Sequence, residues 1–159
     1  VENADLTALR DKLAFKLRVN QVLADNPRIC EFGCNTIERD RTSTKPYAVY
    51  VPKTSDGFRL DDAQIERLRK MCAFIEATLP LPTTKYGRKL IGSYGFKHVL
   101  EKQNWTEDKD RYVSNGEGMV ALMLCGYKPR WLCDNHNPNC VFSVKRSPYL
   151  KLVEYAERR

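Results

Sequence analysis

Apolar residues recur at helical spacing near the start of the chain. Four leucines follow one another at intervals of three and four residues: Leu6, Leu9, Leu13 and Leu17. This spacing predicts an amphipathic helix over residues 5–24, with most basic side chains off the leucine face. The helix is expected to end at Asn26-Pro27, because a residue that precedes proline disfavours the helical conformation.

The clearest helical pattern lies in residues 61–78. Its apolar positions again step by three and four residues: Ile65, Leu68, Cys72, Ile75 and Leu79. Asp61 and Asp62 favour the start of a helix, because acidic side chains interact well with the positive end of the helix dipole. Pro80 marks its end, since proline lacks the amide hydrogen that a continuing helix needs. The pattern covers only two heptads, which favours a packed helix over a coiled coil.

Two shorter helices are predicted further along. The first covers residues 93–103, with Ser93 as its N-cap. The second covers residues 117–124 and is almost entirely apolar, as expected of a central helix. Ser114 and Glu117 precede it with the spacing of a capping box, in which each side chain satisfies a free backbone amide.

The remaining segments predict a last helix and a few strands. Ser147-Pro148 is expected to begin the helix, with serine as the cap and proline at the first helical position. Residues 47–51 and 140–144 are rich in branched and aromatic side chains and are predicted to be short strands. The basic segment 83–91 is interpreted as a linker.

These elements predict an α+β fold: a mostly helical single domain with about five helices and a small sheet of two or three short strands. The 159 residues suit one globular domain, 1–159. No apolar stretch approaches the roughly 20 residues of a membrane-spanning helix, so no membrane partner is expected. Because the sequence does not begin with methionine, it is interpreted as a fragment or processed piece of a longer chain.

The positive charge is unevenly distributed. The chain has 27 basic and 20 acidic residues and a formal net charge of +7. Residues 1–80 contain 13 basic and 12 acidic residues, whereas residues 81–159 contain 14 and 8, a net of +6. A concentrated basic charge favours nucleic acid, another polyanion or an acidic protein as the partner.

The densest part of this charge is the segment 85–98, which contains four basic residues, three aromatic residues and no acid. Lysine and arginine neutralise phosphates, and exposed aromatic rings stack on unpaired bases. The alternative is a solvated loop followed by a helix whose aromatic residues are core. The residues predicted to bind nucleic acid, including four further basic positions, are Lys85, Tyr86, Arg88, Lys89, Ser93, Tyr94, Lys97, His98, Lys128, Arg130, Lys145 and Arg146.

The six cysteines divide into two groups. Cys72 and Cys125 lie in apolar patterns and are expected to be buried as small hydrophobic residues. The others, together with one histidine, are candidate ligands for a structural zinc ion, because thiolate and imidazole groups are preferred zinc ligands: Cys30, Cys34, Cys133, His136 and Cys140. They match no standard zinc motif, so an ordinary polar loop is the alternative. A Cys133–Cys140 or Cys30–Cys34 disulfide is the third interpretation.

No pattern assigns a catalytic residue. An enzyme would need a pocket that brings His98 or His136 beside a thiol or carboxylate. The chain is therefore predicted to be a basic nucleic-acid-binding module of weak sequence specificity, in a reducing intracellular compartment, either cytoplasm or nucleus. The alternative is a structural or protein-interaction subunit of a larger assembly, such as a viral or nucleoprotein particle.

Overall fold

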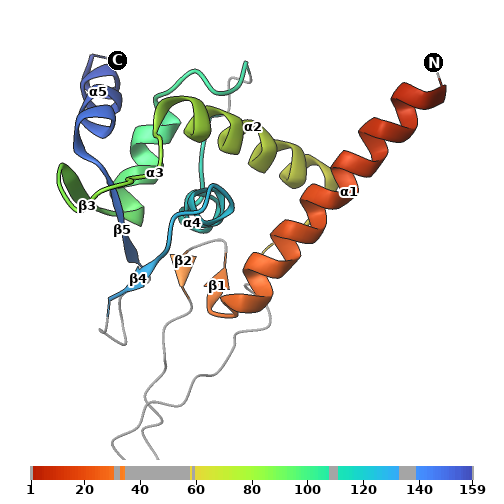
Figure 1. Ribbon diagram of the computed structural model, residues 1–159, viewed down its shortest axis with the longest axis horizontal. Helices are drawn as coiled ribbons and strands as arrows, with labels where there is room; N and C mark the ends of the chain where they lie inside the picture. The colour runs from red at the N-terminus through yellow and green to blue at the C-terminus, as the bar shows by residue number, and fades with distance from the viewer. Residues whose placement is uncertain are drawn as a thin grey trace, which may run out of the picture.

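The structure of the protein, a computed structural model, describes residues 2–30, 33–34, 58, 60–107, 111–132 and 139–158. Five helices lie in these residues: α1 (Glu2–Asp25), α2 (Asp62–Thr78), α3 (Ser93–Glu101), α4 (Asn115–Leu124) and α5 (Arg146–Glu157) (Figure 1). The strands are β1 (Ile29–Cys30), β2 (Gly33–Cys34), β3 (Arg88–Gly92), β4 (Arg130–Trp131) and β5 (Cys140–Lys145). The predicted α+β class, mostly helical with a small sheet, is confirmed. No helix among the described residues is long and apolar enough to cross a membrane.

Helix α4 is the centre of the core and contacts α1, α2 and α3 (Figure 1). Its apolar residues are buried on almost every side, as expected of a helix without a polar face. The predicted capping box is present. The Ser114 hydroxyl accepts a hydrogen bond from the Glu117 amide at 3.1 Å, and the Glu117 carboxylate accepts one from the Ser114 amide at 2.7 Å.

Helix α2 also follows its sequence pattern. Asp61 is the N-cap, and its carboxylate accepts a hydrogen bond from the Gln64 amide at 2.8 Å. The apolar face predicted from the sequence is buried, from Ile65 through Leu79. The Leu79 amide donates to the Ile75 carbonyl at 2.7 Å and closes the last turn before Pro80.

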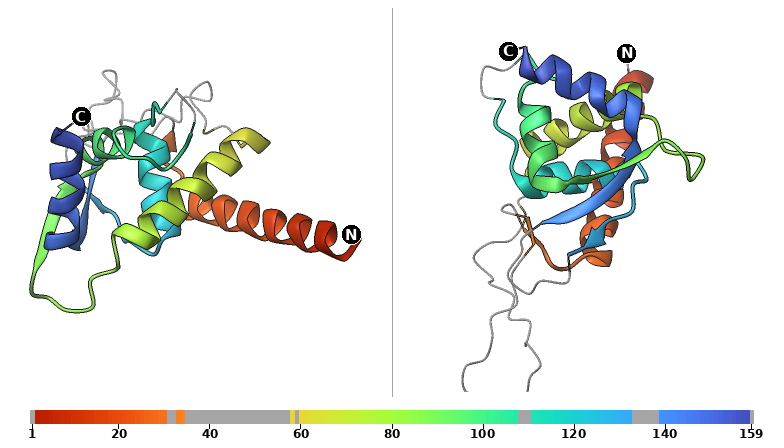
Figure 2. Two further views of the ribbon diagram at one scale, coloured as in Figure 1. Left: turned by 90° about the horizontal axis from the view of Figure 1, so that it is seen from above. Right: turned by 90° about the vertical axis from the view of Figure 1, so that its left-hand side faces the viewer.

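The main sheet has the strand order β3-β5-β4, with both pairs antiparallel. Ile91 lies opposite Phe142, and both are buried on the face that packs against α3 (Figure 2). The linker prediction for residues 83–91 is therefore wrong from Arg88 onward. The consecutive basic residues Arg88 and Lys89 are not typical of a strand, so the sequence did not predict one here. The strand forms because β5, about fifty residues later, supplies its hydrogen-bonding partner.

Two of the predicted N-caps, those of α3 and α5, are wrong. Helix α3 has Gly92 as its N-cap, and Ser93 is its buried first residue. Helix α5 begins at Arg146 with Lys145 as its N-cap, so Pro148 occupies the third helical position. Proline is still tolerated there, because the first-turn amides have no partner within the helix. The predicted strand at 47–51 lies outside the described residues.

Helix α1 packs on the body through a different face from the one that the leucines mark. Val19 is fully buried, and Phe15, Val22 and Leu23 pack around the same core. The leucine row faces away from α2 and α4 and remains exposed: Leu6, Leu9, Leu13 and Leu17. The first turns of α1 project from the rest of the molecule (Figure 2).

Candidate nucleic-acid interface

The pairing of β3 with β5 brings basic residues together on the outer face of the sheet. Arg88 lies directly opposite Lys145, and directly opposite residues of an antiparallel pair point to the same face. Arg130 on β4 lies opposite Val141 of β5. Val141 is four residues from Lys145 and points to the same face, so Arg130 lies on this face too. The two rows are four residue steps apart along β5, from Val141 to Lys145, a span of about 13 Å. The outer face thus carries cations at both ends.

The turn before β3 adds further exposed groups at the Arg88 end. Gly87 has a φ of 67°, a conformation that glycine adopts without strain, and its carbonyl accepts a hydrogen bond from the Arg146 amide at 2.8 Å. This bond fixes the turn to the start of α5. Lys85 and Lys89 are exposed, and Tyr86 is 90% exposed. The tyrosine ring is therefore free to stack on a base.

No acidic residue balances these cations within the sheet. The strands β3, β4 and β5 contain no aspartate or glutamate, and neither does the turn from 81 to 87. Within the described part of the chain, no ion pair involves Arg88, Lys145 or Arg146. We call the group Lys85, Tyr86, Arg88, Arg130, Lys145 and Arg146 the basic sheet face. Lys89 is left out, because it lies opposite the buried Val144 and its side chain therefore points to the other side of the sheet. Lys128 is exposed and precedes β4.

The predicted residues on α3 have a different environment. The rings of Tyr94 and His98 meet edge to face, with centroids 4.7 Å apart. His98 also contacts Glu101, with 2.7 Å between Nδ1 and Oε2. Both rings are partly exposed, but a carboxylate lies beside them. They are therefore a poorer surface for a phosphate than the acid-free sheet.

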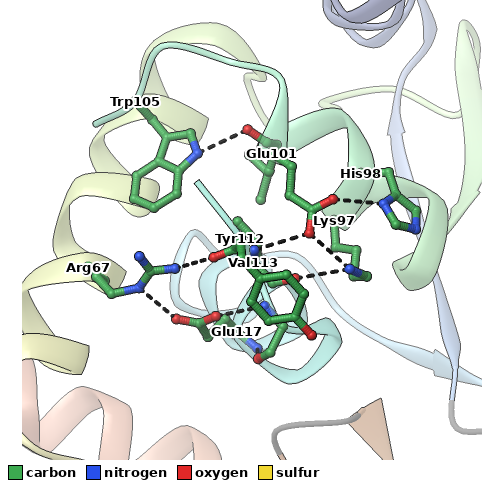
Figure 3. Close-up of polar contacts among 10 residues, drawn as sticks. Arg67, Lys97, His98, Glu101, Trp105, Tyr112, Val113 and Glu117 are labelled. Atoms are coloured by element: carbon green, nitrogen blue, oxygen red, sulfur yellow. Dashed lines mark hydrogen bonds and ion pairs between the residues drawn. The ribbon is translucent and has the colours of Figure 1, made fainter. Parts of the chain in front are cut away.

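Lys97 is only 6% exposed and belongs to an internal polar cluster (Figure 3). Its ammonium donates to the Glu101 carboxylate at 2.9 Å and to the Val113 carbonyl at 3.2 Å. It also lies 4.7 Å from the centre of the Tyr112 ring, a distance suited to a cation–π interaction. These contacts use the charge of Lys97 within the fold, so we do not assign it to the basic sheet face.

Glu101 is held in its ionised form by the same cluster. Partial burial alone raises the pKa of Glu101, but hydrogen bonds from Lys97, the Val113 amide and His98 outweigh it and leave the pKa below its ordinary value. The Val113 amide donates to Glu101 at 3.2 Å, so this carboxylate also fixes the segment that leads into α4. The cluster therefore connects α3 to α4.

A second carboxylate, Glu117, is buried and connects the same segment to α2 (Figure 3). Glu117 accepts hydrogen bonds from Arg67 Nε at 3.1 Å and from Gln64 Nε2 at 2.7 Å. Arg67 also donates to the Tyr112 carbonyl. Sequence analysis missed Glu101 and Arg67. The spacing of four residues between Lys97 and Glu101 was the available signal for the first pair, and nothing local marks Arg67 as the partner of a residue 50 positions away.

Ser93 is 1% exposed and serves the fold. Its hydroxyl accepts a hydrogen bond from the Cys140 amide at 3.3 Å and lies 3.5 Å from the Asn139 side chain. It thereby ties the start of α3 to the start of β5. A polyanion in contact with the surface does not reach this hydroxyl, so Ser93 is also left out of the basic sheet face.

The zinc candidates are only partly described. Cys133 and His136 lie outside the described residues, as does the side chain of Cys34. Cys30 and Cys140 are buried, and no group of three or more metal-ligating side chains occurs among the described residues. Cys72 and Cys125 are buried as predicted. Each of these two thiols faces a backbone carbonyl, at 3.7 Å for Cys72 and 3.6 Å for Cys125.

A cleft of about 510 Å³ lies between α2 and α5. Its lining includes Phe74, Leu152, Lys151 and Tyr155, and it contains no histidine, cysteine or carboxylate. Among the described residues, the cleft therefore does not bring a histidine beside a thiol or carboxylate, although Ser147, Lys151 and Tyr155 line it.

Comparison with known proteins gives no relative for this fold or site: no family model, no curated protein and no solved structure matches the chain. Any functional assignment therefore depends on the residues themselves.

Proposed function

We propose that the protein binds nucleic acid through the basic sheet face, by contacts to phosphates together with stacking on Tyr86. The observation that carries this proposal is the direct opposition of Arg88 and Lys145 on the outer face of the sheet. Like charges opposite each other in an antiparallel pair destabilise the sheet. A bound phosphate between the two side chains removes this repulsion and forms charge-assisted hydrogen bonds with both.

The extent of the face supports a strand of nucleic acid rather than a single anion. Cations lie at both ends of the roughly 13 Å between the Arg88 row and Arg130, far enough for a backbone to meet several of them. Tyr86 stands beside the Arg88 end, where an unpaired base can lie on its ring. Nothing on this face resembles a helix that reads base edges in a groove, so we propose weak sequence specificity.

Fluorescence anisotropy with labelled single-stranded and duplex oligonucleotides of mixed sequence tests the proposal. We expect affinity for single strands to fall with salt, with a log–log slope of about −2 to −3 for three or four phosphate contacts. Arg88→Glu/Lys145→Glu should weaken binding at least about tenfold and reduce the slope. Tyr86→Ala should weaken binding to single strands more than to duplex, because only unpaired bases stack on the ring.

A matched control separates the basic sheet face from net charge. Lys70→Glu/Lys102→Glu makes the same charge change at exposed positions on α2 and at the end of α3. We expect this variant to bind nearly as well as the wild-type chain. Equal losses in the two double variants, or no binding of either oligonucleotide at low salt, would contradict the proposal.

A further inference from the structure

Helix α1 carries a second apolar stripe that no described residue covers. Its four leucines are each between 53% and 67% exposed: Leu6, Leu9, Leu13 and Leu17. At about 100° per residue, Leu13 lies about 120° around the helix from Val19, which is buried against the core. Helix α1 therefore has two apolar faces and uses only one of them to pack on α2 and α4. Single exposed leucines are common on protein surfaces, but a continuous row of four marks an interaction site.

We propose that two copies of the chain associate through this stripe, with their α1 helices antiparallel. The four leucines are arranged almost symmetrically about the point between Asp11 and Lys12. When one helix is turned end for end around that point, Leu6 falls opposite Leu17 of the other copy. Leu9 falls opposite Leu13 to within one residue. A two-fold axis thus brings the same patch of both copies into contact, as in an isologous dimer.

The charges beside the stripe favour the antiparallel arrangement. By the same helical geometry, Asp5 and Lys16 border one edge of the leucine row, and Arg10 borders the other. In an antiparallel two-fold pair, equal edges face each other, so Asp5 of each copy lies near Lys16 of the other, twice in the dimer. In a parallel pair, the edge that carries Asp5 and Lys16 faces the Arg10 edge of the other copy, so the two Asp5–Lys16 contacts do not form. Opposite charges therefore select one orientation, as they do in other helical pairs.

The spacing of the leucines and the direction of the helix fit this use. Intervals of three and four residues place side chains along a narrow seam, as in paired helices. The first turns of α1 project from the body (Figure 1), and all four leucines are exposed, so a second helix can lie along the stripe. This inference is independent of the proposed function. A dimer would nonetheless present two basic sheet faces to one polyanion and raise the avidity of binding.

Sedimentation or light scattering of the full chain over a dilution series tests the dimer. We expect the mass to rise toward twice 18.4 kDa with concentration. Leu9→Gln/Leu13→Gln should remain monomeric, with at least about a tenfold weaker association. These positions are exposed, so the monomer should keep its circular dichroism spectrum and melting temperature. Leu81→Gln/Leu150→Gln is the matched control, because both leucines are exposed outside α1, and it should associate like the wild-type chain.

A mixing experiment tests the orientation. Asp5→Lys alone places a second lysine near Lys16 of the other copy, and Lys16→Asp alone places two aspartates together, so each variant should associate weakly with itself. An equimolar mixture should form a heterodimer in which both contacts are attractive. The absence of this preference would overturn the antiparallel arrangement.

Two results would overturn the dimer itself. One is a wild-type chain that stays monomeric at every concentration, and the other is equal association of the wild type and Leu9→Gln/Leu13→Gln. If the monomer instead binds vesicles of anionic phospholipid through the same leucines, the occupant of the stripe is a lipid surface rather than a second copy.

Discussion

Lys145→Glu should stabilise the free protein while it weakens nucleic-acid binding. In the structure, Lys145 lies directly opposite Arg88 and next to Arg146. The substitution replaces a repulsive cross-strand pair with an attractive one, and such pairs contribute about 0.2–1 kcal/mol each. Because both side chains face solvent, screening keeps the gain below the upper end of this range, at about 0.5 kcal/mol. For a domain of this size, that corresponds to an increase of about 1–2 °C in the melting temperature.

Urea unfolding and anisotropy, measured on the same preparations, test this prediction. The gain in stability should shrink with added salt, because the pair is on the surface. Lys145→Gln removes the repulsion without adding an attraction and should fall between the wild type and Lys145→Glu. Lys128→Glu, at an exposed position before β4, is the control for net charge, and the gain in stability of Lys145→Glu should exceed any gain that this variant shows. A destabilised Lys145→Glu variant, or a gain that does not respond to salt, would refute the reasoning.

Two further predictions concern buried groups. Lys97→Met should lower the free energy of unfolding by about 2–3 kcal/mol, because it leaves the Glu101 carboxylate and the Val113 carbonyl without their buried donor. Since the pKa of Glu101 is lowered in the folded state, the stabilisation from its ionised form is present above its ordinary pKa of 4.5 and is lost as the pH falls below that value. The difference between the wild type and Lys97→Met in urea unfolding should therefore shrink in acid, and a constant difference would count against the pairing. Burial raises the pKa of Tyr127 to about 12, and its hydroxyl donates to the Leu79 carbonyl at 2.6 Å. The stabilisation from the neutral phenol is present below pH 10 and is lost by about pH 12, so Tyr127→Phe should flatten the fall in stability over that range; an unchanged slope would contradict the assignment.

The helix boundaries were largely predictable because the signals that set them are local. Asp61 caps α2, and the Ser114–Glu117 box caps α4, each through hydrogen bonds that span three residues. Helix α1 ends at Asp25, directly before Asn26-Pro27, as its sequence indicates. Side chains within one turn of a helix end decide these features, and no distant segment is needed.

The candidate site was predictable as a composition but not as a surface. The sequence shows basic residues in the segment 85–98, and two more, Lys145 and Arg146, near the end of the chain. Only the register of β3 against β5 shows that Arg88 and Lys145 are neighbours. The same fold withdraws Lys97 and Ser93 into the interior, where each has hydrogen-bonding partners from distant segments. A charged residue in a basic run looks exposed in sequence, because burial depends on partners that the run does not contain.

The sequence by itself determined the fold class, the helices and the excess of positive charge in the second half of the chain. It also determined that α1 has leucines on one face, through their spacing alone. The tertiary structure decided which of the two apolar faces of α1 is buried, since that depends on how α1 meets α2 and α4. It also decided that Arg88–Gly92 is a strand and which cations share its outer face, because a strand exists only with the partner that completes its hydrogen bonds.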